Sequence, residues 1–195
     1  MQKDPKGKTF GLHSSLIIPI AALSLEAISK YVGEATPIDK EGNGYIVNFE
    51  PLGDPNDLEI WTNPRTSLLH NKKQLWIDIE YKGYRNTYKK VFPDIDLNGF
   101  DVDHIFNRGF ARLYNFRYVR LLHVSSSFNR KTGAGIEKDS VQFRNHDFVG
   151  VDYEIQYADV TDMCKLLHLE IGTGVYLDVI DSFHLFYGVN KKFNI

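Results

Sequence analysis

The clearest hydrophobic pattern in the chain is a regular alternation of apolar and polar residues between positions 75 and 81. The apolar positions are Leu75, Ile77, Ile79 and Tyr81. Side chains at every second position of a strand point to the same face of a sheet. The pattern therefore predicts a strand whose odd-numbered residues face the core, the second of two strands that we expect between Leu58 and Tyr81.

Further segments rich in apolar, β-branched and aromatic residues predict four more strands. They are Tyr45 to Phe49 after the turn Glu41 to Gly44, Phe100 to Ile105, Tyr118 to Val124, and Val149 to Tyr157.

Helical periodicity occurs in segments before, between and after these strands along the chain. The expected helices are Leu16 to Val32, with Pro19 near its start, Tyr84 to Val91, ended by Pro93, Arg108 to Asn115 as a short helix or loop, Val160 to Glu170, and Tyr176 to Tyr187. Three consecutive serines at 125–127 are good helix N-caps, so another helix is expected to begin close to Asn129. The fold class predicted is α+β. Because no repeat or long linker is present, we expect a single domain over residues 1–195.

Composition narrows the class of protein. At 195 residues and 43% hydrophobic content, the chain can bury a sizeable core. Its one cysteine, Cys164, cannot form an internal disulfide or supply paired thiolates for a zinc site. No stretch approaches the roughly 20 apolar residues that span a bilayer. We therefore expect a soluble protein without a membrane partner, in a compartment that the sequence leaves open.

Charge is unevenly distributed along the chain. The net charge is −2, which on its face argues against a nucleic-acid partner. From His104 to Lys138, however, seven cationic residues face Glu137 alone, so this segment carries +6 and the remainder −8. Such segregation is typical of a face that binds a polyanion, and it also fits arginines that pair with the acidic remainder.

Asp103 and His104 are the candidates for catalytic chemistry. Hydrolysis of a phosphodiester needs a base, a cation that stabilises the transition state, and groups that hold the phosphate. Asp103 is a hard oxygen ligand for Mg²⁺, and His104 can act as the general base. The two share a site only if the strand ends there, because neighbouring strand residues point to opposite faces. Downstream, Asn129 can orient the base or the water, and Arg130 and Lys131 can bind phosphate oxygens.

The order Asp-His at a strand end, a second strand, and Asn on a helix 25 residues after the His resembles the ββα-metal motif of HNH (endonuclease VII-type) nucleases. The segment from Ser127 to Gly133 is similar to their Asn-x-x-Lys-Gly neighbourhood. The resemblance covers roughly residues 100–138 and implies that Asp103 is a metal ligand, His104 the general base and Asn129 the orienting residue.

The chain departs from the family pattern in three ways, one of which is that Gly133 and Gly135 weaken a helix where the family fold needs one. The zinc-knuckle cysteines that many members carry are absent, and the third motif position, eight residues after Asn129, is Glu137. A glutamate can bind a hard cation, so Glu137 is the expected second metal ligand. The resemblance implies a divalent metal cofactor, Mg²⁺ first, with Mn²⁺, Ni²⁺ or Zn²⁺ as alternatives.

The function predicted is metal-dependent hydrolysis of phosphodiester bonds in DNA, or alternatively RNA, with Arg108, Arg130 and Lys131 holding the phosphates. By resemblance, the setting is an antibacterial toxin or defence nuclease, delivered into a target cell if a toxin, with a cognate immunity protein as partner. The alternative is a non-catalytic interaction protein, such as an immunity or adaptor domain, whose arginines bind an acidic partner.

Other polar residues have simpler interpretations. His123 lies within an apolar strand, where we expect a partly buried, hydrogen-bonded side chain. Cys164 and His168 are spaced four residues apart on an expected helix, but no further ligands accompany them, so core packing is the favoured interpretation.

Overall fold

A computed structural model describes residues 18–49, 73–131, 154–158, 162 and 165–166 of the chain. In chain order the elements are β1 (Pro19–Ala22), α1 (Leu25–Tyr31), β2 (Gly33–Pro37), β3 (Gly44–Phe49), β4 (Lys73–Asp78), α2 (Tyr84–Val91), β5 (Phe100–His104), α3 (Arg108–Leu113), β6 (Tyr118–Ser125), α4 (Ser126–Lys131) and β7 (Ile155–Tyr157). The α+β class expected from the sequence is confirmed.

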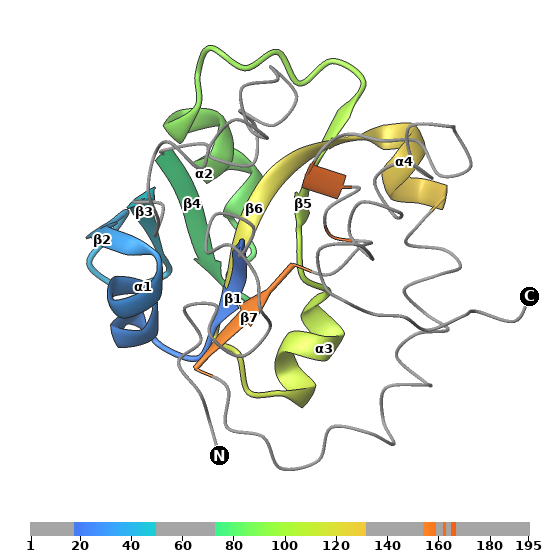
Figure 1. Cartoon of the computed structure of the whole chain (residues 1–195). Coiled ribbons are helices and arrows are strands. Elements are labelled where there is room, and N and C mark those ends of the chain that lie inside the picture. The colour runs from blue at the N-terminus through green and yellow to red at the C-terminus, as the bar shows by residue number, and fades with distance from the viewer. Residues whose placement is uncertain (1–17, 50–72, 132–153, 159–161, 163–164, 167–195) are drawn as a thin grey trace, which may run out of the picture.

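The seven strands form one antiparallel sheet in the order β2-β3-β4-β6-β1-β7, with β5 paired to β6 off this path. β6 is the central strand, and Figure 1 shows it running through the middle of the molecule. One edge of β6 pairs with β4. Its other edge is shared, because β1 pairs with the start of the strand and β5 with its end.

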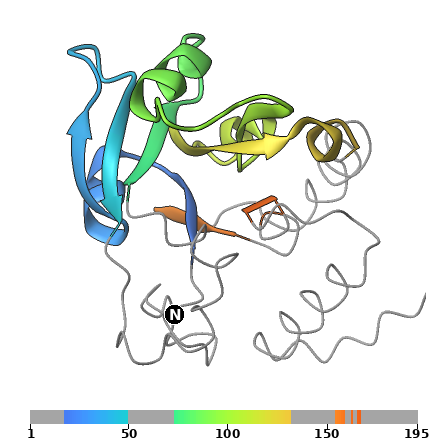
Figure 2. The same ribbon diagram turned by 90° about the horizontal axis from the view of Figure 1, so that it is seen from above.

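Helices α1 and α2 cover opposite faces of the sheet, as the view from above shows (Figure 2). On one face, Tyr84 and Tyr88 of α2 pack on Leu75, Ile77 and Leu121. On the other face, Ala27, Ile28 and Tyr31 of α1 pack on Val47 and Trp76. We call these the α2 face and the α1 face.

The first helix is shorter than the sequence predicts. We expected a helix from Leu16 to Val32, but residues 19–22 form β1 and the helix begins only after Ser24. The Ser24 hydroxyl accepts a hydrogen bond from the Ala27 amide at 3.2 Å, which fixes the helix start there. All four β1 residues are buried, so tertiary pairing with β6 and β7 outweighs the local helical pattern.

The strand predicted from the alternation is present as β4, but both of its faces are buried. Gln74 and Trp76 are 2% and 0% exposed, although the pattern placed only the odd-numbered residues in the core. The strand also ends at Asp78, and Ile79 and Glu80 lie in a turn. A strand in the middle of a covered sheet needs no polar face, so its even positions can carry a tryptophan.

Most other predicted elements match in position. α2 has the predicted bounds, and β3, β5, α3 and β6 differ from them by two residues at most. α4 begins at Ser126, three residues before the expected start at Asn129. β2 is not predicted by the hydrophobic pattern. Of the segments predicted at 149–157, 160–170 and 176–187, only residues 154–157, 162 and 165–166 are described. The first of the two strands expected between Leu58 and Tyr81 falls mainly on residues 50–72, which also lie outside the described residues.

No helix of the described residues is long and apolar enough to cross a membrane.

Candidate functional site

Asp103 and His104 lie at the end of β5, as predicted, but on opposite faces of the sheet. β5 ends at His104. Asp103 is paired in register with Leu122, and His104 with Leu121. Directly paired residues of antiparallel strands share a face. Leu121 belongs to the α2-face cluster, so His104 lies on the α2 face and Asp103 on the α1 face. The structure therefore does not bring Asp103 and His104 into one site.

His104 is buried against α2. Its side chain is 4% exposed, and its ring packs edge-on against Tyr84, with ring centroids 4.5 Å apart. The Nε2 atom is buried and has no hydrogen-bond partner among the described residues. Asn129, expected to orient this ring, is bonded to Asp101 instead.

Burial and nearby cations keep His104 neutral. Desolvation is the main cause that lowers its pKa to about 3, and the positive charges of Arg108, Arg85, Lys165 and Arg112 lower it further. A general base works best with a pKa near the operating pH. In this environment the imidazole is a weak proton acceptor, and the general-base role of His104 stays a prediction.

The α1 face of β5 holds a different group of polar side chains. Asp101 and Asp103 are two residues apart and therefore point to the same face. The Asn129 amide donates to Asp101 Oδ2 at 3.2 Å. The ammonium of Lys165 donates to Asp103 Oδ2 at 3.3 Å and to the carbonyl of Ile105 at 3.4 Å. We call Asp101, Asp103, Asn129 and Lys165 the β5 polar cluster.

The β5 polar cluster combines a buried cation with a partly exposed carboxylate. The Lys165 side chain is only 2% exposed, whereas that of Asp103 is 24% exposed. A buried ammonium strongly favours a nearby carboxylate, because the low-polarity surroundings weaken its hydration. Lys165 thus anchors one side of the cluster, while Asp103 keeps access to solvent.

α4 supplies Asn129 and the cations that follow it. The Ser125 hydroxyl accepts a hydrogen bond from the Phe128 amide at 3.2 Å, which ends β6 and caps α4. Phe128 of α4 is buried, Asn129 is partly buried, and Arg130 is exposed. Lys131 is the last residue of α4, and Glu137 lies outside the described residues.

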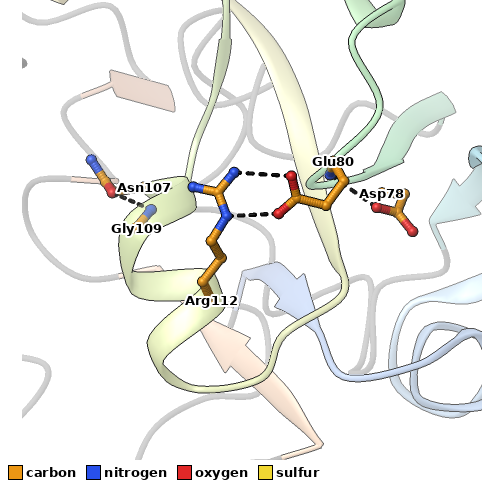
Figure 3. A network of polar contacts seen from close by, with 5 residues as sticks. All are labelled: Asp78, Glu80, Asn107, Gly109 and Arg112. Carbon is orange, nitrogen blue, oxygen red and sulfur yellow. Dashed lines mark hydrogen bonds and ion pairs between the residues drawn. The ribbon is translucent and has the colours of Figure 1, made fainter.

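Arg108 is the first residue of α3 and is exposed. Asn107 caps this helix by accepting a hydrogen bond from the Gly109 amide at 2.7 Å (Figure 3). One turn later, Arg112 forms a two-point ion pair with Glu80, with distances of 2.6 and 3.2 Å. Arg108 is close enough to Glu80 and His104 to lower the pKa of each. Arg108 is therefore near His104, but it is not bonded to the β5 polar cluster by any contact that we find in the described residues, and its role in holding phosphate stays a prediction.

Oxygen donors in the β5 polar cluster fit a hard divalent cation. Asp101 and Asp103 supply carboxylates, and the Asn129 side chain supplies an amide oxygen; such ligands suit Mg²⁺. Among the described residues no group of three His, Cys, Asp or Glu side chains is placed to hold a metal. The cluster thus offers two carboxylates, and Glu137, the second metal ligand expected from the sequence, belongs to the part of the chain that is not described.

Sequence reasoning missed two members of the cluster. Asp101 could have been found, since its spacing of two from Asp103 within a predicted strand places both carboxylates on one face. Lys165 carries no such signal, because it is 62 residues from Asp103 in the chain. His123, by contrast, is confirmed as hydrogen-bonded, with its Nδ1 2.9 Å from the Tyr88 hydroxyl.

Comparison with known proteins returned no match to a family profile, a curated protein or a solved structure.

Proposed function

We propose that this protein is a metal-dependent nuclease whose site is the β5 polar cluster. The observation that supports the proposal best is the presence of two carboxylates, Asp101 and Asp103, on one face of β5, each held by a hydrogen bond from a different element. Carboxylate pairs of this kind bind Mg²⁺ in enzymes that act on phosphates. In this proposal Asp103 keeps its predicted role as a metal ligand, and Asp101 joins it.

Each member of the cluster has a chemical role in the proposal. Asp101 and Asp103 would hold the cation, which when bound supplies Lewis acidity and an activated water. Asn129 fixes the Asp101 carboxylate, in place of the imidazole or the water that the motif implies. The Lys165 ammonium fixes Asp103 and places a positive charge beside it, where negative charge on a phosphate would be stabilised.

The cationic side chains that would bind the nucleic-acid backbone belong to two helices, α4 and α3. Arg130 and Lys131 belong to α4, which also carries Asn129, so they would hold phosphates next to the cluster. Arg108 begins α3, and its charge, like that of the exposed Arg85 of α2, lowers the pKa of His104. α4 lies beside the start of β5, where Asn129 meets Asp101, and α3 follows the end of β5, so a strand of DNA or RNA would have to run along β5 to meet both groups. The basic segment 104–138 supports this path.

The setting that we propose is an antibacterial or defence effector, in keeping with the HNH resemblance. A basic site on a chain whose remainder carries −8 would suit an acidic immunity protein that covers the arginines. DNA is the first substrate to test, and RNA the second.

A cleavage assay tests the proposal. The purified protein is incubated with plasmid DNA and with RNA in Mg²⁺, in Mn²⁺ and in EDTA. We expect cleavage that requires the metal and that falls at least about 100-fold in Asp103→Asn and in Asp101→Asn, because each substitution removes a ligand charge. Asp94→Asn is the matched control, since Asp94 is an exposed carboxylate in the segment before β5.

Substitution of His104 distinguishes a site at the β5 polar cluster from the site that the motif alone predicts. Our proposal expects His104→Gln to retain most of the activity of a folded protein. If His104→Gln is inactive while Asp101→Asn is active, the general base is His104 and the β5 polar cluster is not the site. If the protein cuts neither DNA nor RNA with either metal, the nuclease proposal fails.

One observation favours a non-catalytic role as the second candidate. The Asp103–Lys165 ion pair contains a fully buried ammonium and joins segments 62 residues apart, as a structural anchor would. A protein of this kind would bind an acidic partner through its arginines. It would lose stability in Asp103→Asn without ever showing metal-dependent cleavage.

A further inference from the structure

Arg120 is the most deeply buried charged side chain on the central strand. It lies in the middle of β6 and is 1% exposed. Burial lowers the pKa of its guanidinium to about 10, so the group still carries its charge at neutral pH. A buried charge is strongly unfavourable unless a partner of opposite charge or several hydrogen bonds compensate it.

Neighbouring strands do not provide that partner. On β4 the residue paired with Arg120 is Trp76, and on the other side the Ile105 amide donates to the Arg120 carbonyl at 3.0 Å. Nη1 of Arg120 has no hydrogen-bond acceptor within the described part of the chain, and no ion pair of Arg120 is found there. Asp103 lies on the same face two residues before Ile105, but its carboxylate is bonded to Lys165.

Gln74 adds a second buried donor without an acceptor. It is 2% exposed and lies two residues before Trp76 on the same face of β4, which makes it a diagonal neighbour of Arg120. Its Oε1 accepts a hydrogen bond from the Trp76 indole at 2.9 Å. That bond fixes the orientation of the amide, and Nε2 is left without a partner among the described residues.

Both groups that lack an acceptor in the described part of the chain are donors, and one of them is a cation. Two neighbouring buried donors are satisfied together by a group with two acceptor oxygens and a negative charge, which a guanidinium can bind in a two-point geometry. We propose that Arg120 and Gln74 form a binding site for an oxyanion, a phosphate or a carboxylate group, on the α1 face between β4 and β6. This site does not depend on the proposed nuclease activity.

Thermal unfolding in different anions tests the site. A ligand that binds only the folded state raises the melting temperature in a concentration-dependent way. We expect inorganic phosphate or acetate to raise it by several degrees over chloride at equal ionic strength and pH. A shift in phosphate identifies a phosphoryl ligand, and a shift in acetate alone identifies a carboxylate. No shift in either anion would overturn the proposal.

Two substitutions make the test specific. Gln74→Glu places a carboxylate beside Arg120 without changing the size of the side chain, so it should raise the melting temperature in chloride and abolish the response to added anion. Arg120→Met should also abolish the response. Arg117→Met is the control, because Arg117 is exposed and paired with Asp78, and it should respond as the wild type does.

The contrary result is equally clear. If Gln74→Glu lowers the melting temperature and responds to phosphate as the wild type does, the anion binds elsewhere and the site does not exist. Since Gln74→Glu keeps the arginine, it gives an answer even if Arg120→Met does not fold.

Discussion

Asp103 and His104 are neighbours in the chain, yet one side chain meets the ammonium of Lys165 on the α1 face and the other meets the ring of Tyr84 on the α2 face. The strand geometry at the end of β5 imposes this separation, because successive side chains alternate between the faces of a sheet. A site that uses Asp103 therefore recruits Asp101 from the same face more readily than it recruits His104.

Burial of neutral His104 predicts that the protein loses stability in mild acid. The folded pKa of about 3 lies below the unfolded value of about 6.5, so the unfolded state binds more protons as pH falls between these values. The stabilising contribution is complete above pH 6.5 and is lost on acidification. At pH 5 the loss is about 2 kcal/mol.

Urea unfolding at pH 7.5 and pH 5 in EDTA measures this effect. His104→Leu should lose about 2 kcal/mol less than the wild type between the two pH values, since the titrating group is gone. Equal losses in the two proteins would show that His104 does not titrate as a buried residue.

Asn107 is predicted to control the start of α3. Its side chain accepts the Gly109 amide at 2.7 Å, so Asn107→Ala should lower the free energy of unfolding by about 1 kcal/mol. Asn107→Asp keeps an acceptor oxygen and should be close to the wild type. Chemical denaturation compares the two variants, and a loss of the same size in both would mean that the cap is not the cause.

Gly44 is required by the close approach of β3 to β4. A β-carbon at this position would lie 2.6 Å from the Trp76 carbonyl oxygen and from Cδ1 of Ile77. Gly44→Ala should therefore cost about 1–3 kcal/mol in stability. Gly99→Ala tests backbone conformation instead, since Gly99 has a φ of 79° and open space around its α-carbon. If Gly44→Ala unfolds at the same denaturant concentration as the wild type, the two strands can separate there without cost.

How far the sequence predicts the structure depends on whether the signal is local. α2 and the β5–α3–β6–α4 run were predictable because each carries a short-range pattern, such as the Pro93 stop or the serines before α4. β1 was mistaken for helix, because its four apolar residues are compatible with either periodicity and only pairing with β6 decides.

The candidate site follows the same rule. Asp103 and Asn129 were selected from a motif, and Asp101 could have been predicted from the alternation of side chains along a strand. Lys165 meets Asp103 only through the folded chain, and the donors of Arg120 and Gln74 that have no acceptor among the described residues are defined by neighbours on other strands. Burial of His104 is likewise a tertiary property, which a dipeptide cannot indicate.

The Asp103–Lys165 ion pair is predicted to show strong coupling. Asp103→Asn leaves the buried Lys165 ammonium without its carboxylate partner, and breaking the pair in this way should cost about 3 kcal/mol. Lys165→Met should cost less, because the Asp103 carboxylate that remains is partly exposed to solvent. The double variant Asp103→Asn/Lys165→Met should lose less than the two single losses added together. Additive losses, measured by urea unfolding, would contradict a direct interaction between the two side chains.

Metal binding at the β5 polar cluster is the most direct test of the proposed function. Titration calorimetry with Mn²⁺ on the metal-free protein should show one binding site in the wild type and in the Asp94→Asn control. Binding should be weakened at least about 10-fold in Asp101→Asn and Asp103→Asn. A wild-type protein that binds no Mn²⁺, or equal affinity in all four proteins, would contradict a metal-dependent site on Asp101 and Asp103.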